Sequence, residues 1–388
     1  MILRVLCFFF LGFVCNNIYG TVITYTLDQN ALLVHKIDIN LGKDLIKNRS
    51  FKKLINEADS YISKKVLPSV TLNKNILENQ NQNDYVSFGR YWWPNENSKD
   101  GLPYILIDGK TNNTNLRNSD KIYIDEVSRE IFVLGLAYYY TQDDKYAVFA
   151  SEVLKCFFID EDTKMAPNME YAQIVPGKKD SGGAVIESAV FLDLIDGIQL
   201  IKSSDFIDTD VLKGVKDWFV DYLYWMDNSL KGKNDKKRIN NLGTYNTLLR
   251  VVFNLFTENR VIAQDIYLNE VGVHIKNQIS NDGSMPLELK RAIPLGYVKF
   301  NLLAYSMLIN AGKCFSNNLL NEDPLLNKKL NSAFEWLGAF YDGEKEWTLS
   351  SEKSVIYDVD VEQYYSIEEL SLLRFKVRRF YNYLDFLI

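Results

Sequence analysis

The chain has 388 residues, of which 47% are hydrophobic and 24% are charged, and its formal net charge is −6. No long basic block interrupts this acidic balance, which argues against a nucleic-acid-binding protein. With only 8 prolines and no linker rich in Pro, Gly or Ser, the sequence predicts one large catalytic-type domain behind an N-terminal lead-in.

The first twenty residues have the features of a secretory signal. One early arginine, Arg4, precedes an apolar run from Val5 to Cys15, and small and polar residues follow up to Gly20. The run is too short to cross a bilayer comfortably, and no later stretch is apolar enough to do so. We therefore expect a secreted protein, periplasmic if bacterial, with no membrane span after cleavage. An uncleaved anchor is the alternative.

After a lead-in over residues 21–80, apolar residues recur at helical spacing and mark pairs of helices. We expect helices over 122–140 and 145–158, 183–202 and 208–229, 243–257 and 260–280, and 298–312 and 324–342. Repeated antiparallel hairpins predict an all-α fold, an incomplete (α/α) toroid, over residues 81–345, followed by a C-terminal segment over 346–388.

Three long segments interrupt the helices, at residues 85–120, 160–183 and 283–295. Loops of this length in a compact domain are usually functional or disordered. These are rich in Trp, Tyr, Asn and Arg, so function is favoured.

Two cysteines and two glycosylation sequons could carry the modifications that secreted proteins receive. Cys156 and Cys314 either form one disulfide or remain two buried thiols, because both lie in apolar helical surroundings. Asn48 and Asn112 begin glycosylation sequons, which matter only in a host that glycosylates secreted proteins.

Four segments collect candidate site residues. They are SFGRYWWPNENSKDGLPYILIDGKTN (87–112), MAPNMEYAQIVPG (165–177), RINNLGTYNT (238–247) and NDGSMPLELKRAIPLGYVKFNLLAY (281–305). The rings of Tyr91, Trp92 and Trp93 stack on sugar faces or plug the mouth of the toroid. Asn240 and Asn241 line a site or merely start a helix.

Taken together, these segments resemble the alginate lyase domain family of polysaccharide lyases. The resemblance rests on GRYWWPN with DGLPYI, NMEYAQ followed by PG, NNxGTY, and DGSMPLEL with a following Tyr and FNL, in that order. It covers roughly residues 80 to 305, and less specifically the helices to about 345. The resemblance implies β-elimination on a 4-linked uronic-acid polysaccharide, such as alginate or a glucuronan.

The family's site residues carry over one by one. Asn241 corresponds to the residue that neutralises the sugar carboxylate, and Tyr297 to the catalytic tyrosine. Arg291, six residues before that tyrosine, could bind a carboxylate bidentately. Asn240 and Gln173 are expected to hydrogen-bond the sugar.

Basic and aromatic side chains in or beside the same segments complete the expected binding surface. Arg90, Tyr245 and Lys290, with the three rings of the first segment, are assigned to substrate binding. Lys236, Lys237 and Arg238 are solvated surface charges or extend a positive groove that attracts a polyanion.

The family's catalytic histidine does not carry over. Leu242 stands where the family's NNHG motif has His, Gly296 where many relatives have a second His, and Ile293 where they often have Arg. The two histidines of the chain, His35 and His274, lie outside these motifs, and His274 is expected to be structural.

Two consequences of the missing histidine compete. In a syn elimination one tyrosine serves as base and then as acid, with the pKa of Tyr297 expected to be lowered by Arg291 and Lys290. Otherwise the chain is a catalytically inactive polyuronate-binding protein.

A third reading is a glycoside hydrolase, which needs two carboxylates such as Asp193 with Asp196, or Glu170 with Glu187. No HxxxH, CxxC or acidic calcium loop is present, so neither metal nor cofactor is expected.

Overall fold

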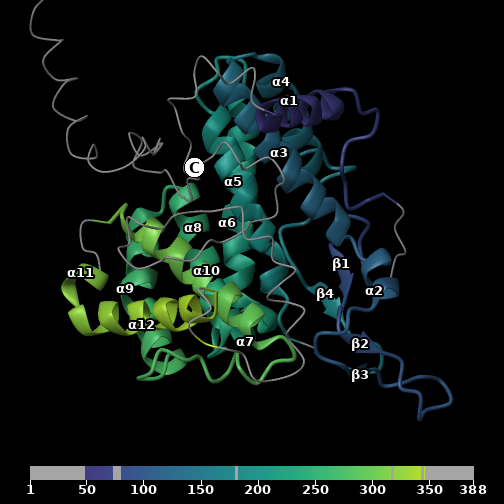
Figure 1. The fold of residues 1–388 in the computed structure, drawn as a ribbon. Coiled ribbons are helices and arrows are strands. Elements are labelled where there is room, and N and C mark those ends of the chain that lie inside the picture. The colour runs from purple at the N-terminus through teal and green to yellow at the C-terminus, as the bar shows by residue number, and fades with distance from the viewer. Residues whose placement is uncertain (1–48, 73–79, 180–181, 316–318, 342–344, 346–388) are drawn as a thin grey trace, which may run out of the picture.

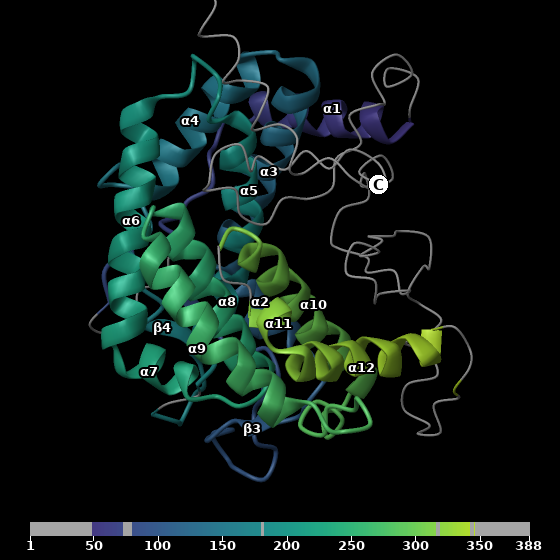
Figure 2. The ribbon, with the colours of Figure 1, turned by 90° about the vertical axis from the view of Figure 1, so that its left-hand side faces the viewer.

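The computed structural model describes residues 49–72, 80–179, 182–315, 319–341 and 345. Its helices, in chain order, are α1 (Arg49–Ile62), α2 (Asn113–Arg117), α3 (Lys121–Thr141), α4 (Lys145–Phe158), the 3₁₀ helix η4 (Val185–Val190), α5 (Phe191–Ile201), α6 (Thr209–Asn228), α7 (Leu230–Lys236), α8 (Asn241–Phe256), α9 (Arg260–Gln278), α10 (Pro294–Gly312), α11 (Leu319–Glu322) and α12 (Pro324–Tyr341). The predicted all-α fold is confirmed. The described helices form an open arc and do not close into a barrel (Figure 1 and Figure 2).

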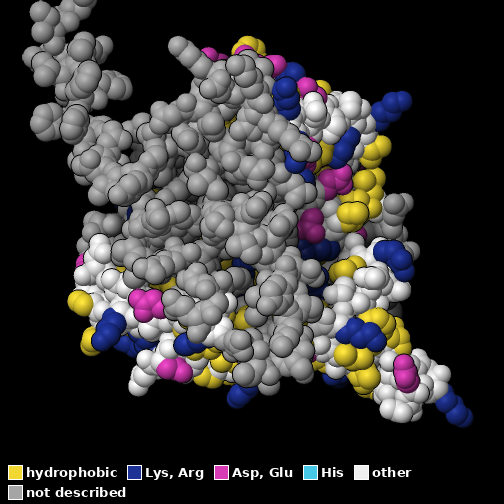
Figure 3. All heavy atoms as spheres, in the orientation of Figure 1, with side chains coloured by type: hydrophobic (Ala, Val, Ile, Leu, Met, Phe, Trp, Pro, Cys, Tyr) yellow, Lys and Arg dark blue, Asp and Glu magenta, His cyan; other side chains and the backbone are white. Residues whose placement is uncertain are grey.

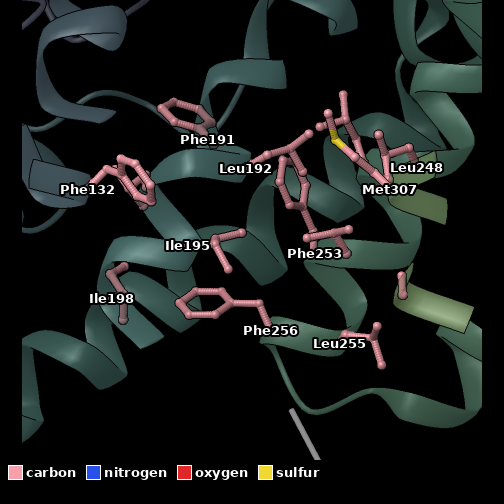
Figure 4. Packing of buried hydrophobic residues seen from close by; sticks show 14 of the residues in the cluster. Phe132, Phe191, Leu192, Ile195, Ile198, Leu248, Phe253, Leu255, Phe256 and Met307 are labelled. Carbon is pink, nitrogen blue, oxygen red and sulfur yellow. The ribbon is translucent and has the colours of Figure 1, made fainter. Parts of the chain in front are cut away.

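The core lies where α3, α5 and α8 meet. Figure 4 shows Phe253 of α8 beside Leu192 of α5 and Phe256 of α8 beside Ile195 of α5, and all four side chains are almost completely buried. Phe219 of α6 packs its ring against Phe253 with 4.8 Å between centroids. Much of the chain's abundance of aromatic residues therefore forms helix packing.

Helices α3 and α5 approach each other unusually closely. A Cβ added at Gly197 would lie 2.4 Å from the carbonyl oxygen of Ile131, and one at Gly135 would lie 2.6 Å from the carbonyl oxygen of Gly197. Neither position has room for a side chain, so this pair of glycines determines how near the two helices lie.

The segment predicted as a long loop over 85–120 contains short strands. Strand β1 (Val86–Phe88) pairs in parallel with β4 (Tyr171–Ile174), and β2 (Trp92–Trp93) pairs antiparallel with β3 (Ile105–Leu106). Residues 89–112, here named the β2–β3 projection, extend from the helical body (Figure 1). Sequence periodicity could not reveal strands of two to four residues.

Two asparagines close the base of the β2–β3 projection. Asn112 caps α2 by accepting hydrogen bonds from the backbone N–H groups of Thr114 and Asn115, and its Nδ2 donates to the carbonyl of Trp92 at 2.9 Å. Asn115 donates to the carbonyl of Gly89 at 2.8 Å. Asn112 is buried and fully engaged, so it is not an accessible glycosylation site. Asn48 lies outside the described residues.

Helix α1 is the described structure within the predicted lead-in over 21–80. It packs on α3, where Arg129 Nε donates to Glu57 Oε1 at 2.6 Å and Lys64 pairs with buried Glu130. None of the helices in the described ranges combines the length and the apolar character that a membrane span needs. The predicted signal over 1–20 lies outside those ranges.

Candidate functional site

Three segments of the chain meet at Tyr297, where four side chains form one cluster. Arg291 lies flat on the Tyr297 ring, with its Cζ 3.7 Å from the ring centroid, and its Nη2 donates to Tyr297 Oη at 2.7 Å. Tyr297 in turn donates to Tyr91 Oη at 3.3 Å. Asp108 accepts from Arg291 Nε at 2.9 Å and Nη2 at 2.7 Å. The sequence predicted three members of this cluster but not Asp108.

The pKa of Tyr297 moves in the direction opposite to the one expected. Burial raises it well above its usual value, and the hydroxyl of Tyr91 raises it further, whereas the charge of Arg291 lowers it by less. Arg291 is less effective than expected because Asp108 neutralises it, and Lys290 is exposed to solvent. In the free chain, Tyr297 therefore carries its proton at neutral pH.

A buried carboxylate holds Asn241 at the start of α8. Glu288 Oε1 accepts from the backbone N–H of Asn241 at 2.8 Å, and Oε2 accepts from its Nδ2 at 2.5 Å. Both residues are at most 2% exposed, and burial raises the pKa of Glu288. Glu288 thus aims the amide of Asn241, although it was not assigned a role from the sequence despite lying in the DGSMPLEL motif.

Behind this first turn, Gln278 of α9 joins three helices. Its Nε2 donates to the carbonyl of Asn240 at 3.2 Å, and its Oε1 accepts from Thr244, Asn301 and Tyr305 within 3.0 Å. Asn301 is four residues after Tyr297 on α10, so the same buried amide ties the helix of Tyr297 to the helix of Asn241.

His274 belongs to the same buried network, as expected of a structural histidine. Gln278 Nε2 donates to its Nδ1 at 3.2 Å, so Nε2 carries the proton and donates to Thr247 Oγ1 at 2.9 Å. Thr247 donates onward to Glu270 at 2.7 Å. Burial lowers the pKa of His274, which keeps the ring neutral.

Gln173 and Leu242 are neighbours at a second part of the site. A Cβ added at Gly183 would lie 3.6 Å from Leu242 Cδ1 and 4.0 Å from Gln173 Oε1. Gln173 adopts φ +53°, a left-handed conformation that is unusual for a residue with a side chain. Its backbone N–H donates to Ser87 Oγ at 2.8 Å, and Ser87 donates to Glu187. Such strain is often found at functional positions.

Three rings of the β2–β3 projection, those of Tyr91, Trp92 and Trp93, each have a cation over the ring face. Lys178 Nζ lies 4.1 Å from the ring centroid of Trp92, Lys110 Nζ lies 4.5 Å from that of Trp93, and the guanidinium of Arg90 lies 5.4 Å from that of Tyr91. Figure 3 shows basic and hydrophobic side chains side by side at this end of the molecule. Aromatic and cationic groups together suit a sugar that bears a carboxylate.

The structure does not place Tyr245 at the site. Its side chain is 2% exposed and stacks on Phe300 with 4.3 Å between centroids, so it belongs to the packing between α8 and α10. The helical period explains this position, because Tyr245 lies one turn after the buried Asn241.

The structure does not support the two carboxylate pairs considered for a glycoside hydrolase. Asp193 and Asp196 are buried within α5 at 6% and 3% exposure, so neither reaches a polymer. Glu170 accepts from Trp225 Nε1 at 3.1 Å, and Glu187 accepts from Tyr85 and Ser87 at 2.5 Å each.

Across the described ranges, no group of three or more His, Cys, Asp and Glu side chains is arranged to hold a metal ion. Cys156 and Cys314 are both free thiols, which settles the alternative between a disulfide and two free cysteines.

Comparison with known proteins identifies a family for this fold. The family model described as alginate lyase matches residues 69–347. The fold is similar to that of an alginate lyase from Bacteroides ovatus, with a TM-score of 0.75 and 27% identity over 87% of this chain and 89% of that one.

A more distant likeness is to alginate lyase A1-III from a Sphingomonas species, with a TM-score of 0.49 and 13% identity over 84% and 83% of the two chains. A variant of that enzyme is known in complex with a tetrasaccharide. Comparison with curated protein sequences finds no match.

Proposed function

The chain belongs to the alginate lyase family, and from that premise we propose that it cleaves a 4-linked polyuronate by β-elimination, with Tyr297 as base and then acid. The observation that carries the proposal is the cluster in which Arg291 donates to Tyr297 Oη and Tyr297 donates to Tyr91 Oη. It gives one phenol a cationic donor that stabilises its ionised form.

The proposed reaction transfers one proton from C5 to O4 and breaks the C5–H and C4–O4 bonds of the substrate. The phenolate of Tyr297 removes the C5 proton, the electron pair forms the C4=C5 double bond, and the C4–O4 bond breaks. Tyr297 then returns the proton to O4. The amide of Asn241, aimed by Glu288, and the remaining N–H groups of Arg291 would stabilise the charge that develops on the carboxylate. No oxidant or reductant is required.

A single proton-transfer residue limits the stereochemistry of the substrate. Tyr297 reaches both atoms only if the C5 proton and O4 lie on the same face of the sugar ring. This holds for D-mannuronate and D-glucuronate, whereas L-guluronate places them on opposite faces. We therefore propose polymannuronate or a glucuronan as the substrate and expect polyguluronate to resist cleavage.

The first experiment follows the ultraviolet absorbance of the unsaturated uronate with each of the three polymers. We expect the wild-type chain to produce this absorbance from polymannuronate or glucuronan, and Tyr297→Phe to lose at least about 100-fold of the rate, since general acid–base groups contribute that much. Tyr224→Phe is the control, because Tyr224 is 71% exposed on α6, and it should leave the rate unchanged.

The alternatives give different results in the same experiment. New reducing ends without new absorbance would indicate a glycoside hydrolase and overturn the elimination. If calorimetry detects binding of a polymer that the chain does not cleave, the result would support a catalytically inactive polyuronate-binding protein. Secretion stays a proposal, which the mass of the N-terminal peptide of the exported chain would test.

A further inference from the structure

Asp108 connects the β2–β3 projection to the loop before α10. It directly follows the segment that contains β3, and both of its carboxylate oxygens accept hydrogen bonds. Oδ1 accepts from Arg291 Nη2 at 2.7 Å, and Oδ2 accepts from Arg291 Nε at 2.9 Å and from the backbone N–H of Ala292 at 2.9 Å. A Cβ added at the next residue, Gly109, would lie 2.9 Å from Ala292 Cβ, so the two segments are in close contact.

This carboxylate determines where the guanidinium of Arg291 can lie. A side-on, bidentate pair fixes both the position and the plane of an arginine, which a single hydrogen bond does not. In that plane Arg291 covers the Tyr297 ring, and the second hydrogen of Nη2 points at Tyr297 Oη. The pair is about one quarter exposed, with side-chain exposures of 28% and 25%.

The pairing also changes which edge of Arg291 faces the substrate. The edge formed by Nε and Nη2, which would most readily take a sugar carboxylate, is already occupied by Asp108. Within the described part of the chain, no hydrogen bond is recorded for Nη1, so Nη1 is the group left for the substrate.

We propose that Asp108 is a positioning residue of the elimination site, which holds Arg291 against Tyr297 and leaves Nη1 as the donor to the sugar carboxylate. The proposal rests on the proposed function. Asp108 touches neither reacting atom, and it acts through Arg291 alone. Asp108 therefore affects the pKa of Tyr297 in two opposite ways. Its own carboxylate disfavours the phenolate, and the arginine that it holds favours the phenolate more strongly.

The test is Asp108→Asn, which keeps the size of the side chain but loses its charge and one acceptor. The single oxygen of the amide cannot accept from Nε and Nη2 of Arg291 and also from the backbone N–H of Ala292. We therefore expect Arg291 to leave the Tyr297 ring. We expect kcat to fall about 10- to 100-fold, as small misplacements of catalytic groups do, with a smaller change in KM. Asp100→Asn is the matched control, because Asp100 lies in the same projection and its carboxylate accepts from Ser98 Oγ and the backbone N–H of Leu102 in a local turn.

A second measurement separates positioning from simple anchoring of the loop. A difluorinated tyrosine is placed at position 297 and its ionisation is followed by fluorine NMR, in the parent chain and with Asp108→Asn. We expect the pKa of this residue to rise in the variant, because the lost arginine outweighs the lost carboxylate. An unchanged or lowered pKa would show that Asp108 only anchors the projection, and would overturn the proposal.

The two proposals fail separately. If the wild-type chain produces no unsaturated uronate, the lyase function is refuted, while the fluorine titration still decides whether Asp108 holds Arg291 on Tyr297.

Discussion

Leu242 stands where, by the resemblance to the alginate lyase family, a histidine that transfers protons is expected. It follows Asn241 on the first turn of α8, it is half-buried, and its Cδ1 lies near Gly183 beside the amide of Gln173. A leucine cannot transfer a proton, so the proposed reaction uses Tyr297 as its base, and the raised pKa of Tyr297 leaves little phenolate at neutral pH. The site is therefore expected to be slow at neutral pH and faster in alkali.

We predict that Leu242→His raises the rate at neutral pH by about tenfold or more, because an imidazole is largely unprotonated there and can act as base. The measurement is kcat/KM against pH on polymannuronate, with Leu242→Met as a control for side-chain volume. The gain should be greatest near neutral pH and should become smaller as the pH rises, because the phenolate fraction of Tyr297 in the parent chain grows with pH. An equal rate for both variants at all pH values would contradict a base at this position.

At the residue scale, the sequence motifs predicted candidate site residues but not the residues that hold them in place. Asn241, Arg291 and Tyr297 could be assigned because they lie in recognisable motifs. Glu288 and Asp108 could not, because their partners are 47 and 183 residues away and only the folded chain brings them together. The predicted direction of the Tyr297 pKa shift was wrong, because burial and the hydroxyl of Tyr91 raise this pKa by more than the charge of Arg291 lowers it.

At the scale of elements, the crossing of α3 and α5 depends on two glycines that look unfavourable in the sequence. Glycine inside a helix costs stability relative to alanine, so Gly135 and Gly197 would be read as weak points. The structure shows the reason for them, because the backbone of each helix fills the space where the other's Cβ would be.

We predict that Gly197→Ala destabilises the fold despite the better helix propensity of alanine. The added methyl group would lie 2.4 Å from the carbonyl oxygen of Ile131, and overpacking of this kind costs about 1–3 kcal/mol or more. Urea unfolding followed by circular dichroism measures the change. Gly214→Ala on α6 is a milder comparison, because its nearest neighbour is the flexible end of Ile159 at 2.8 Å. Equal or greater stability of Gly197→Ala would contradict the close crossing.

The helices themselves were predictable because helical periodicity is a local property. The expected helix over 145–158 is observed as α4, and α3 differs by one residue at each end from the expected 122–140. The parallel pairing of β1 with β4 was not predictable, because Val86 pairs with Tyr171 far along the chain and neither strand is long enough to show alternation.

At the scale of the whole molecule, the charge near the site differs in sign from the net charge of the chain. The chain carries −6 overall, yet exposed basic residues gather around the site and the β2–β3 projection, among them Arg90, Lys110, Lys178 and Lys290. Local potential rather than net charge governs the approach of a polyanion.

We predict that KM for a polyuronate rises several-fold as sodium chloride increases from about 0.05 to 0.5 M, because salt screens exposed charges. The rate at saturating polymer should change much less, since the Asp108–Arg291 pair is partly buried. The double variant Lys110→Met with Lys178→Met should weaken this salt dependence. A KM that does not change with the concentration of sodium chloride would argue against electrostatic attraction of the substrate.

The fixed hydrogen bonds of His274 have a consequence for how the protein takes up and releases protons. Most proteins buffer between about pH 5 and 8 through histidine. This chain has two histidines, and His274 is locked as a neutral tautomer between Gln278 and Thr247. His274 is therefore expected to bind or release few protons in that pH range. Proton uptake or release on binding a polymer near neutral pH, measured by calorimetry in buffers of different ionisation enthalpy, is therefore expected to owe little to His274.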